Sequence, residues 1–265
     1  MSHDQGLWPV DLPDCLAVER RDPVAILWLN RPEKRNALSD ELVMGMQAFF
    51  SSVPDDVRAI VVAGKGKHFC AGLDLNELKE TDILESCEKS VIGQGLNNLI
   101  QYCRVPVISV LQGAVVGGGL EIAASTHIRV AEESTFYALP EGTRGIFLGS
   151  GGSVRLPRLI GADAVMDMML SGRVYNAKDG YSHLRISQYL VEEGEGLETA
   201  LEIASKVAAN SKLSNYAVVQ ALPRILESDP QTGLFTELPL AGVAARSHPA
   251  KRRLPGFLAF EIDQA

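Results

Sequence analysis

Short apolar runs alternate with helical patterns over the first part of this chain, and helical patterns alone continue after it. The apolar runs predict strands at residues 16–20, 24–29, 59–63, 107–111, 113–116, 128–131 and 135–138. Helical spacing covers 39–50, where Ser39 is a capping residue, and then 83–103 and 118–125. From residue 154 the pattern turns helical, and from 197 it is helical almost throughout. Strands that alternate with helices, followed by a helical tail, predict an α/β core with an α-helical C-terminal part.

The composition limits what such a fold can do. Apolar residues make up 46% of the 265 residues and charged residues 22%, which permits a sizeable core. The net charge of −8 and the pI of about 5.2 argue against a nucleic-acid-binding surface, so no nucleic-acid partner is expected. An anionic ligand stays possible, because a few local cations and helix N-termini can hold phosphates on an acidic protein.

Other sequence patterns further narrow the class of protein to which the chain can belong. The first six residues lack a charged and apolar leader pattern, and the most apolar run, 105–124, contains Pro106, Gln112 and Glu121. We therefore expect neither a signal peptide nor a membrane span. The four cysteines form no CxxC pair, which indicates reduced thiols and a cytoplasmic protein. The five histidines are scattered without ligand spacing, so no protein-bound metal is expected.

Three glycines at 117–119 lie between an apolar strand and a short helix. Glycine lets a ligand approach the backbone closely, and the first N–H groups of a helix lack internal partners and lie at the positive end of its dipole. Such a segment suits a developing oxyanion. Dinucleotide-binding folds also place glycines after a strand, but the spacing here is not GxGxxG and the segment lies in the middle of the chain.

Glu121 follows Gly118 by three residues, which places both on one face of the helix, one turn apart. Its neighbours are Leu120 and an Ile-Ala-Ala run. A carboxylate in apolar surroundings is costly unless it is paired or functional, and its burial raises its pKa. The alternative interpretation is an ordinary solvated glutamate on a helix.

A second glutamate, Glu141, follows Pro140 in a loop after a predicted strand. A loop glutamate is usually just exposed, so this position is weak evidence alone. Glycines follow at 142, 145, 149, 151 and 152, and so many beside a carboxylate indicate a backbone shaped around a ligand. No GxSxG occurs here, so a serine-hydrolase elbow is not supported. Two carboxylates with backbone N–H donors are the groups that stabilise an enolate while water adds across an adjacent double bond.

Four segments in a fixed order carry a resemblance to a known family. They are Asn30-Arg31-Pro32 with Asn-Ala-Leu at 36–38, Phe-Cys-Ala-Gly-Leu-Asp at 69–74, Gly113 with Gly-Gly-Gly-Leu-Glu at 117–121, and Pro140-Glu141 with Gly-Ser-Gly-Gly at 149–152. Together they resemble the crotonase (enoyl-CoA hydratase/isomerase) superfamily over nearly the whole chain. The resemblance implies a crotonase fold, with a spiral of ββα turns over 1–196 and a C-terminal α-helical trimerisation part over 197–265. It also implies a homohexamer built from two trimers.

The resemblance further implies an acyl-CoA thioester as substrate and no bound cofactor. The two backbone N–H groups that hold the thioester oxygen in the family match Leu73 and Gly118, and the two hydratase glutamates match Glu121 and Glu141. Many members with other activities lack one glutamate, so the presence of both favours hydration. The residues expected to bind CoA are Lys34, Arg35, Ala71, Asp74, Lys251 and Phe257.

The chain also departs from the usual hydratase pattern. Gly142-Thr143-Arg144 follows Glu141 where apolar residues are usual, and Phe260 replaces a basic residue, so that Lys251, Arg252 or Arg253 would supply the charge. These changes argue against a long apolar acyl chain. The segments 140–147 and 151–158 resemble family members that hydrate methylthioacryloyl-CoA, release methanethiol, and hydrolyse the thioester to acetaldehyde, CoA and CO₂.

Two other functions stay open from the sequence. An ordinary short-chain enoyl-CoA hydratase of fatty-acid or aromatic degradation would share every motif. A crotonase-fold RNA-binding protein is the non-enzymatic alternative, and the acidic pI together with the two glutamates argues against it.

Overall fold

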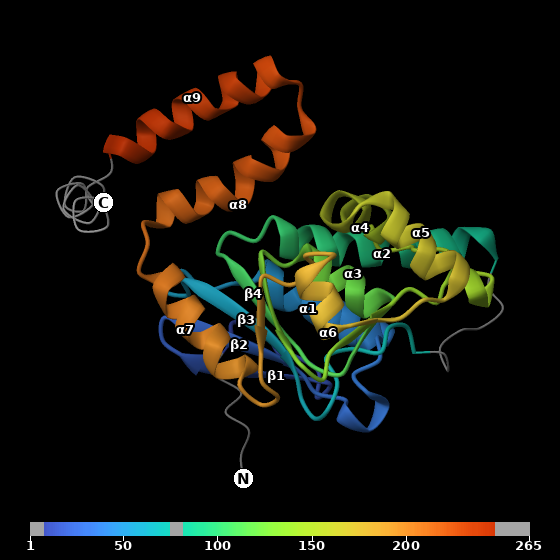
Figure 1. Ribbon diagram of the computed structural model, residues 1–265. Coiled ribbons are helices and arrows are strands. Elements are labelled where there is room, and N and C mark those ends of the chain that lie inside the picture. The colour runs from blue at the N-terminus through green and yellow to red at the C-terminus, as the bar shows by residue number, and fades with distance from the viewer. Residues whose placement is uncertain (1–7, 75–81, 247–265) are drawn as a thin grey trace, which may run out of the picture.

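Figure 1 shows the computed structural model of the protein, which describes residues 8–74 and 82–246. Its strands are β1 (Leu16–Arg21), β2 (Val24–Leu29), β3 (Ala59–Gly64), β4 (Val107–Leu111), β5 (Ala114–Val116), β6 (Ile128–Glu132), β7 (Phe136–Ala138), β8 (Tyr175–Asn176) and β9 (Tyr189–Val191). Its helices are α1 (Asp40–Ser51), α2 (Ile83–Gln101), α3 (Gly118–Ser125), α4 (Gly152–Ile160), α5 (Ala162–Ser171), α6 (Ala177–Ser182), α7 (Gly196–Ala208), α8 (Lys212–Glu227) and α9 (Pro230–Arg246). In the described part of the chain, the 3-10 helices η1 (Pro32–Lys34) and η3 (Gly142–Arg144) lie in loops.

The strands form two sheets. The larger sheet has the order β1-β2-β3-β4-β6-β9, in which β1 and β2 are an antiparallel hairpin and the remaining pairs are parallel. The smaller sheet has the order β5-β7-β8, and β5 pairs with β7 in parallel. The pairs β4–β5 and β6–β7 therefore each give one strand to each sheet. This is the repeated ββα turn that the resemblance implied, and the α/β expectation is confirmed.

Alternate residues of the larger sheet enter two different cores, because successive side chains of a strand point to opposite faces. On one face, Leu27 and Val62 join a core with residues of α1, α2 and α3. On the other face, Ile26 and Val61 join a smaller core with Ala200, Leu201, Ile203 and Ala204 of α7. The sheet is thus buried on both faces, and its central strands are continuous apolar runs for that reason.

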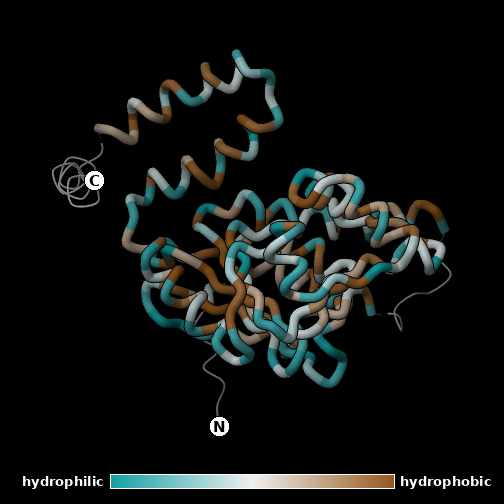
Figure 2. The backbone as a smooth tube through the Cα atoms, in the orientation of Figure 1, coloured by the Kyte–Doolittle hydropathy of each residue, from teal (hydrophilic) through white to brown (hydrophobic). Residues whose placement is uncertain are grey.

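The C-terminal helices differ in how they pack. Helix α7 covers the larger sheet, whereas α8 and α9 extend away from the body of the molecule (Figure 1). Figure 2 shows hydrophobic and hydrophilic residues alternating along these two helices. Apolar side chains are exposed on both of them, namely Val218, Leu222, Leu226, Leu234, Phe235, Leu238 and Val243. The division of the chain after residue 196 stays a prediction, but α7 packs with the core.

The sequence patterns missed the strands β8 and β9, which lie where the pattern after residue 154 predicted helix, and the two short 3-10 helices described above. Strands β8 and β9 have only two and three residues, which is too short for a period to show. The predicted helix at 39–50 begins as expected, because the Ser39 side chain accepts a hydrogen bond from the Leu42 N–H at 3.2 Å. Within the described residues, no helix is both long and apolar enough to cross a bilayer.

Candidate active site

The turn between β5 and α3 presents a backbone donor. Gly117 adopts a φ of 53°, which turns the chain from strand to helix, and its own N–H donates to the carbonyl of Ala138 at 2.9 Å. Gly118 is the first residue of α3, so its N–H has no partner four residues before it in a helix. Among the described residues, this N–H donates no hydrogen bond, and it lies at the positive end of α3.

A second donor lies in the loop after β3. Leu38 and Leu73 form an isolated parallel bridge. The Leu38 N–H donates to Gly72 O at 2.8 Å, and the Asp74 N–H donates to Leu38 O at 3.0 Å. The bridge thus uses the groups on either side of Leu73 and leaves the Leu73 N–H pointing away from it, without an acceptor in the described parts of the chain.

The two donors lie side by side. Gly72 has a φ of 87°, and a Cβ placed on it would be 2.8 Å from the carbonyl oxygen of Val116 and 3.6 Å from the nitrogen of Gly118. The 69–73 loop therefore runs directly against the turn that begins α3. The two free N–H groups therefore belong to neighbouring segments, and their role as an oxyanion hole stays a prediction.

Glu121 is buried one turn into α3, with 4% of its surface exposed. Its Oε1 accepts hydrogen bonds from the backbone N–H groups of Ser150, at 3.0 Å, and Gly152, at 2.7 Å. Burial raises the pKa of the Glu121 carboxyl, while these two N–H groups and the charge of Arg155 oppose the rise. The alternative of a solvated helix glutamate is wrong.

Glu141 is buried between β7 and η3, with 8% of its surface exposed. A Cβ placed on Gly117 would lie 2.6 Å from its Oε1, so this carboxyl group reaches the β5–α3 turn. Its Oε2 is buried and finds no hydrogen-bond partner among the described residues. Burial raises the pKa of Glu141, and the nearby charge of Glu121 raises it further, while its own backbone N–H and Arg144 oppose the rise.

Both carboxyl groups therefore border one glycine turn. Gly117 contacts Glu141, and a Cβ on Gly118 would lie 3.9 Å from Glu121 Oε2, the oxygen that the 150–152 backbone does not hold. Two titratable groups and two free N–H donors thus surround the start of α3. Such a site can polarise a carbonyl oxygen and exchange protons with a bound molecule.

The glycines at 149–152 have a different role from the expected one. They were predicted to shape the backbone around a ligand, whereas here Gly152 lies against the Glu121 side chain, Gly151 against Arg155 and Gly149 against Ser90. A Cβ on Gly152 would lie 2.6 Å from Glu121 Cγ. The absence of a side chain is what lets the 150–152 N–H groups close on the carboxylate.

The residues expected to bind CoA are only partly brought together. Lys34 and Arg35 are exposed in the loop beside the donor pair, and Arg35 O accepts the Ala71 N–H at 3.1 Å. Asp74 is 5% exposed and forms an ion pair with Arg31 at 2.9 Å, so its carboxylate anchors this loop. Lys251 and Phe257 lie outside the described residues, as do Arg252, Arg253 and Phe260. The CoA-binding roles of these residues remain predictions.

The segment expected to form a polar acyl wall is exposed. Thr143 and Arg144 are exposed in η3, and the Thr143 hydroxyl donates to Pro140 O at 2.8 Å, whereas a Cβ on Gly142 would overlap the carbonyl oxygen of Met169. Ile146 and Phe147 follow, with 42% and 70% of their surface exposed. The exposed segment after Glu141 therefore carries apolar as well as polar side chains. Arg144 remains close enough for its charge to lower the pKa of Glu141.

Two residues that matter for the site were assigned no role from the sequence. Asn36 is fully buried at a φ of 54°, and its amide donates to Lys65 O and His68 O at 3.0 and 2.7 Å. Arg31 donates to Ala37 O at 2.6 Å in addition to its pairing with Asp74. Their types gave no signal, because an Asn or Arg in a polar loop is usually exposed. Within the described residues, no cluster of His, Cys, Asp or Glu could hold a metal ion.

Known proteins with similar sequences share this fold. The family model described as “Enoyl-CoA hydratase/isomerase” matches residues 19–258. The chain is 33% identical to the 2,3-dehydroadipyl-CoA hydratase of Escherichia coli, covering 92% of this chain and 95% of that one. It is 30% identical to the short-chain-enoyl-CoA hydratase of Clostridium acetobutylicum, covering 91% and 93%. A crystal structure described as a “putative enoyl-CoA hydratase from Rhodopseudomonas palustris CGA009” has 51% identity and a TM-score of 0.89, covering 97% of this chain and all of the other.

The buried Glu141 carboxyl predicts a pH dependence of stability. Its pKa is higher in the folded protein than in the unfolded chain, so the folded state loses its proton less readily. The free energy of unfolding therefore falls as the pH rises through the folded-state pKa. Glu141→Gln removes this loss, and the variant should gain stability over the natural protein as the pH rises from mildly acidic to neutral.

Urea denaturation at fixed protein concentration, repeated over that pH range, measures the effect. The exposed Glu88→Gln on α2 is the matched control and should show no such pH-dependent gain. A difference between Glu141→Gln and the natural protein that is constant with pH would contradict the prediction.

Proposed function

Since the chain belongs to the enoyl-CoA hydratase/isomerase family, we propose that it adds water across the double bond of a short α,β-unsaturated acyl-CoA. The observation that carries this proposal is the pair of buried glutamates, Glu121 and Glu141, at one glycine turn beside two free backbone N–H groups. Hydration needs one group that takes a proton from water and one that delivers a proton to the neighbouring carbon. The relatives from E. coli and C. acetobutylicum, both named as hydratases, support the same reaction.

The different surroundings of the two glutamates suggest different roles. Glu121 accepts two backbone hydrogen bonds and lies near Arg155, and both features favour its ionised form. Glu141 has a buried oxygen without a partner among the described residues and feels the negative charge of Glu121, which favours its protonated form. We therefore assign Glu121 as the base that activates water for attack on Cβ and Glu141 as the acid that protonates Cα.

The N–H groups of Leu73 and Gly118 would hold the thioester oxygen. Addition of water at Cβ moves negative charge onto this oxygen as an enolate forms. Two donors that are already in place stabilise that charge without having to reorganise during the reaction. The CoA moiety supplies the thioester that makes Cβ electrophilic and the Cα proton exchange possible, and the chain needs no further group for this chemistry.

Methylthioacryloyl-CoA is the substrate that the sequence segments 140–147 and 151–158 favour. Water added at its Cβ gives a hemithioacetal, which collapses to an aldehyde as the C–S bond breaks and methanethiol leaves. Hydrolysis of the remaining thioester would release CoA, and loss of CO₂ from the resulting β-aldehyde acid would give acetaldehyde. The alternative is an ordinary short-chain enoyl-CoA hydratase, which the name of the C. acetobutylicum relative favours.

A substrate panel tests the proposal. The purified protein is given crotonyl-CoA, 2-octenoyl-CoA and methylthioacryloyl-CoA, and the products are identified by mass spectrometry. We expect hydration, with kcat/KM higher for the four-carbon than for the eight-carbon chain, and methanethiol release from the third substrate. Glu121→Gln and Glu141→Gln should each slow hydration by at least ~10²-fold, since each removes a proton-transfer group.

The outcomes separate the alternatives. Turnover of crotonyl-CoA without methanethiol release would leave the ordinary hydratase, and a preference for 2-octenoyl-CoA would overturn the short-chain proposal. No turnover of any enoyl-CoA, together with RNA binding at low salt, would favour the non-enzymatic alternative.

A pair of substitutions at Gly118 tests the oxyanion hole. Proline is tolerated at the first position of a helix, so Gly118→Pro removes the N–H with little effect on α3. Gly118→Ala is the matched control, because it adds the same Cβ beside Leu38 and keeps the N–H. Relative to the alanine variant, the proline variant should lose roughly 10²–10³-fold in kcat for crotonyl-CoA. Equal kcat values for the alanine and proline variants would show that the Gly118 N–H is not part of the oxyanion hole.

A homohexamer built from two trimers is the proposed assembly. Its support in the structure is the set of exposed apolar side chains on α8 and α9, which extend from the body and are uncovered in a single chain. Light scattering of the natural protein should give six copies. Replacing Leu226, Leu234 and Phe235 together by Ser should give smaller species, whereas a natural protein that is monomeric at micromolar concentration would refute the assembly.

A further inference from the structure

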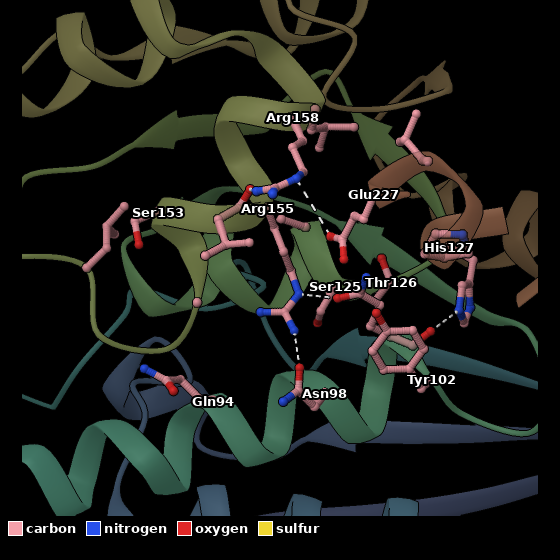
Figure 3. A pocket seen from close by; sticks show the side chains of 18 of the residues that line it. Gln94, Asn98, Tyr102, Ser125, Thr126, His127, Ser153, Arg155, Arg158 and Glu227 are labelled. Carbon is pink, nitrogen blue, oxygen red and sulfur yellow. Dashed lines mark hydrogen bonds and ion pairs between the residues drawn. The ribbon is translucent and has the colours of Figure 1, made fainter. Parts of the chain in front are cut away.

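Arg155 is a half-buried cation close to the active site, and its hydrogen bonds have no part in the reaction as proposed so far. It lies on α4, and its guanidinium enters a cavity of about 520 Å³ between α2, α3, α4 and α8 (Figure 3). Its Nε donates to Gln101 Oε1 at 2.5 Å and its Nη2 to Asn98 Oδ1 at 2.6 Å. Among the described residues it forms no ion pair, so its charge is held in place by neutral amides of α2.

The same side chain reaches the loop that holds Glu121. Its Nη1 donates to the carbonyl oxygen of Ser150 at 3.4 Å. Asn97 of α2 is 1% exposed, and its Nδ2 donates to that same oxygen at 2.8 Å. The Ser125 hydroxyl at the end of α3 donates to Ile122 O at 2.6 Å and lies 3.3 Å from Asn97 Oδ1. The Ser150 carbonyl is thus held from two helices.

Holding this carbonyl has a direct effect on the active site. The N–H groups of Ser150 and Gly152 both donate to Glu121 Oε1, so the position of this short segment decides where the carboxylate points. Gln94 adds a third anchor by donating to Gly149 O at 3.2 Å. A loop of small residues would otherwise adapt freely, and a shift of about 1 Å at a proton-transfer group can cost roughly 10²-fold in rate.

The groups around the carboxylate come from three elements. Arg155 of α4 contributes a positive charge, Glu141 after β7 is the second titratable carboxyl group, and α2 contributes the uncharged Asn97. On the far side of Arg155, Glu227 of α8 forms an ion pair with Arg158 at 3.7 Å. His127 accepts the Val107 N–H at Nδ1 and lies against Gln101 O at Nε2, and burial lowers its pKa, which keeps it neutral.

We propose that Arg155 and Asn97 are positioning residues for Glu121. They clamp the 149–152 segment that aims its carboxylate, and the positive charge of Arg155 also favours the ionised form of this carboxylate. This inference rests on the proposed role of Glu121 as the base in hydration. The reaction would then depend on a second layer of residues, which lies on the side of α3 away from the oxyanion hole.

The pH dependence of hydration distinguishes this role from a merely structural one. A base must be ionised, so activity falls at acidic pH as Glu121 gains its proton. Removing the positive charge of Arg155 makes the carboxylate bind its proton more tightly. Arg155→Met should therefore move the acidic limb of the kcat/KM profile for crotonyl-CoA to higher pH and lower kcat by about 10²-fold.

Matched variants separate the effect of the Arg155 charge from the effect of the hydrogen bonds to the 149–152 segment. Arg155→Lys keeps the charge but not the fork of donors, so it should return the acidic limb towards its natural position while kcat stays low. Asn97→Ala should lower kcat without changing KM, because the CoA contacts are untouched. Arg158→Met, one turn further along α4 in the same cavity, is the control and should leave the profile unchanged.

The results can overturn the inference independently of the proposed function. If Glu121→Gln is inactive but Arg155→Met keeps the natural kcat and pH profile, the clamp is refuted and hydration stands. If Glu121→Gln is fully active, the proposed function itself fails. Circular dichroism and thermal melting check that each variant folds, and where Arg155→Met does not fold, Arg155→Lys and Asn97→Ala decide. Natural activity in both of these would refute the clamp.

Discussion

Close packing around three consecutive glycines is the constraint on which the active site depends. A Cβ on Gly117 would lie 2.6 Å from Glu141 Oε1, one on Gly118 would lie 2.7 Å from Leu38 Cδ1, and one on Gly119 would overlap the carbonyl oxygen of Cys70. Each glycine is therefore contacted by a different part of the chain. A side chain at Gly119 would push against the backbone of the loop that presents the second donor, and one at Gly117 would displace the Glu141 carboxyl group, whereas at Gly118 the flexible end of Leu38 can move aside.

The two glutamates meet because successive ββα turns of the spiral superimpose. Strands β5 and β7 are parallel, with Val116 opposite Ala138, so the residues that follow each strand emerge side by side at one edge of the small sheet. The Gly117 N–H bonds to Ala138 O at that edge. Residues 121 and 141 are far apart in the sequence but follow equivalent strands, and the sheet alone brings their carboxyl groups to the same turn.

The sequence was sufficient to predict the helices and strands with strong periodicity, and the candidate site residues that a neighbouring glycine or proline marks. The strands of the larger sheet up to β6, the start of α1 at Ser39 and the two glutamates were predicted because each carries a local signal. Asn36, Asn97 and Arg155 carry none, since their importance comes from carbonyl groups that lie 32, 53 and 5 residues away. The 149–152 glycines were recognised but attributed to a ligand, because the sequence does not show that Glu121 folds back onto them.

The surroundings of the two carboxyl groups explain how identical side chains can have opposite tasks. Burial raises the pKa of both, which makes each of them costly to ionise. At Glu121 two backbone donors and Arg155 behind the loop oppose part of this cost, whereas the inner oxygen of Glu141 has no such partner among the described residues. Ionising Glu121 first then makes the proton on Glu141 harder to remove. The pair therefore favours one shared proton, held on Glu141, the group that we propose as the acid.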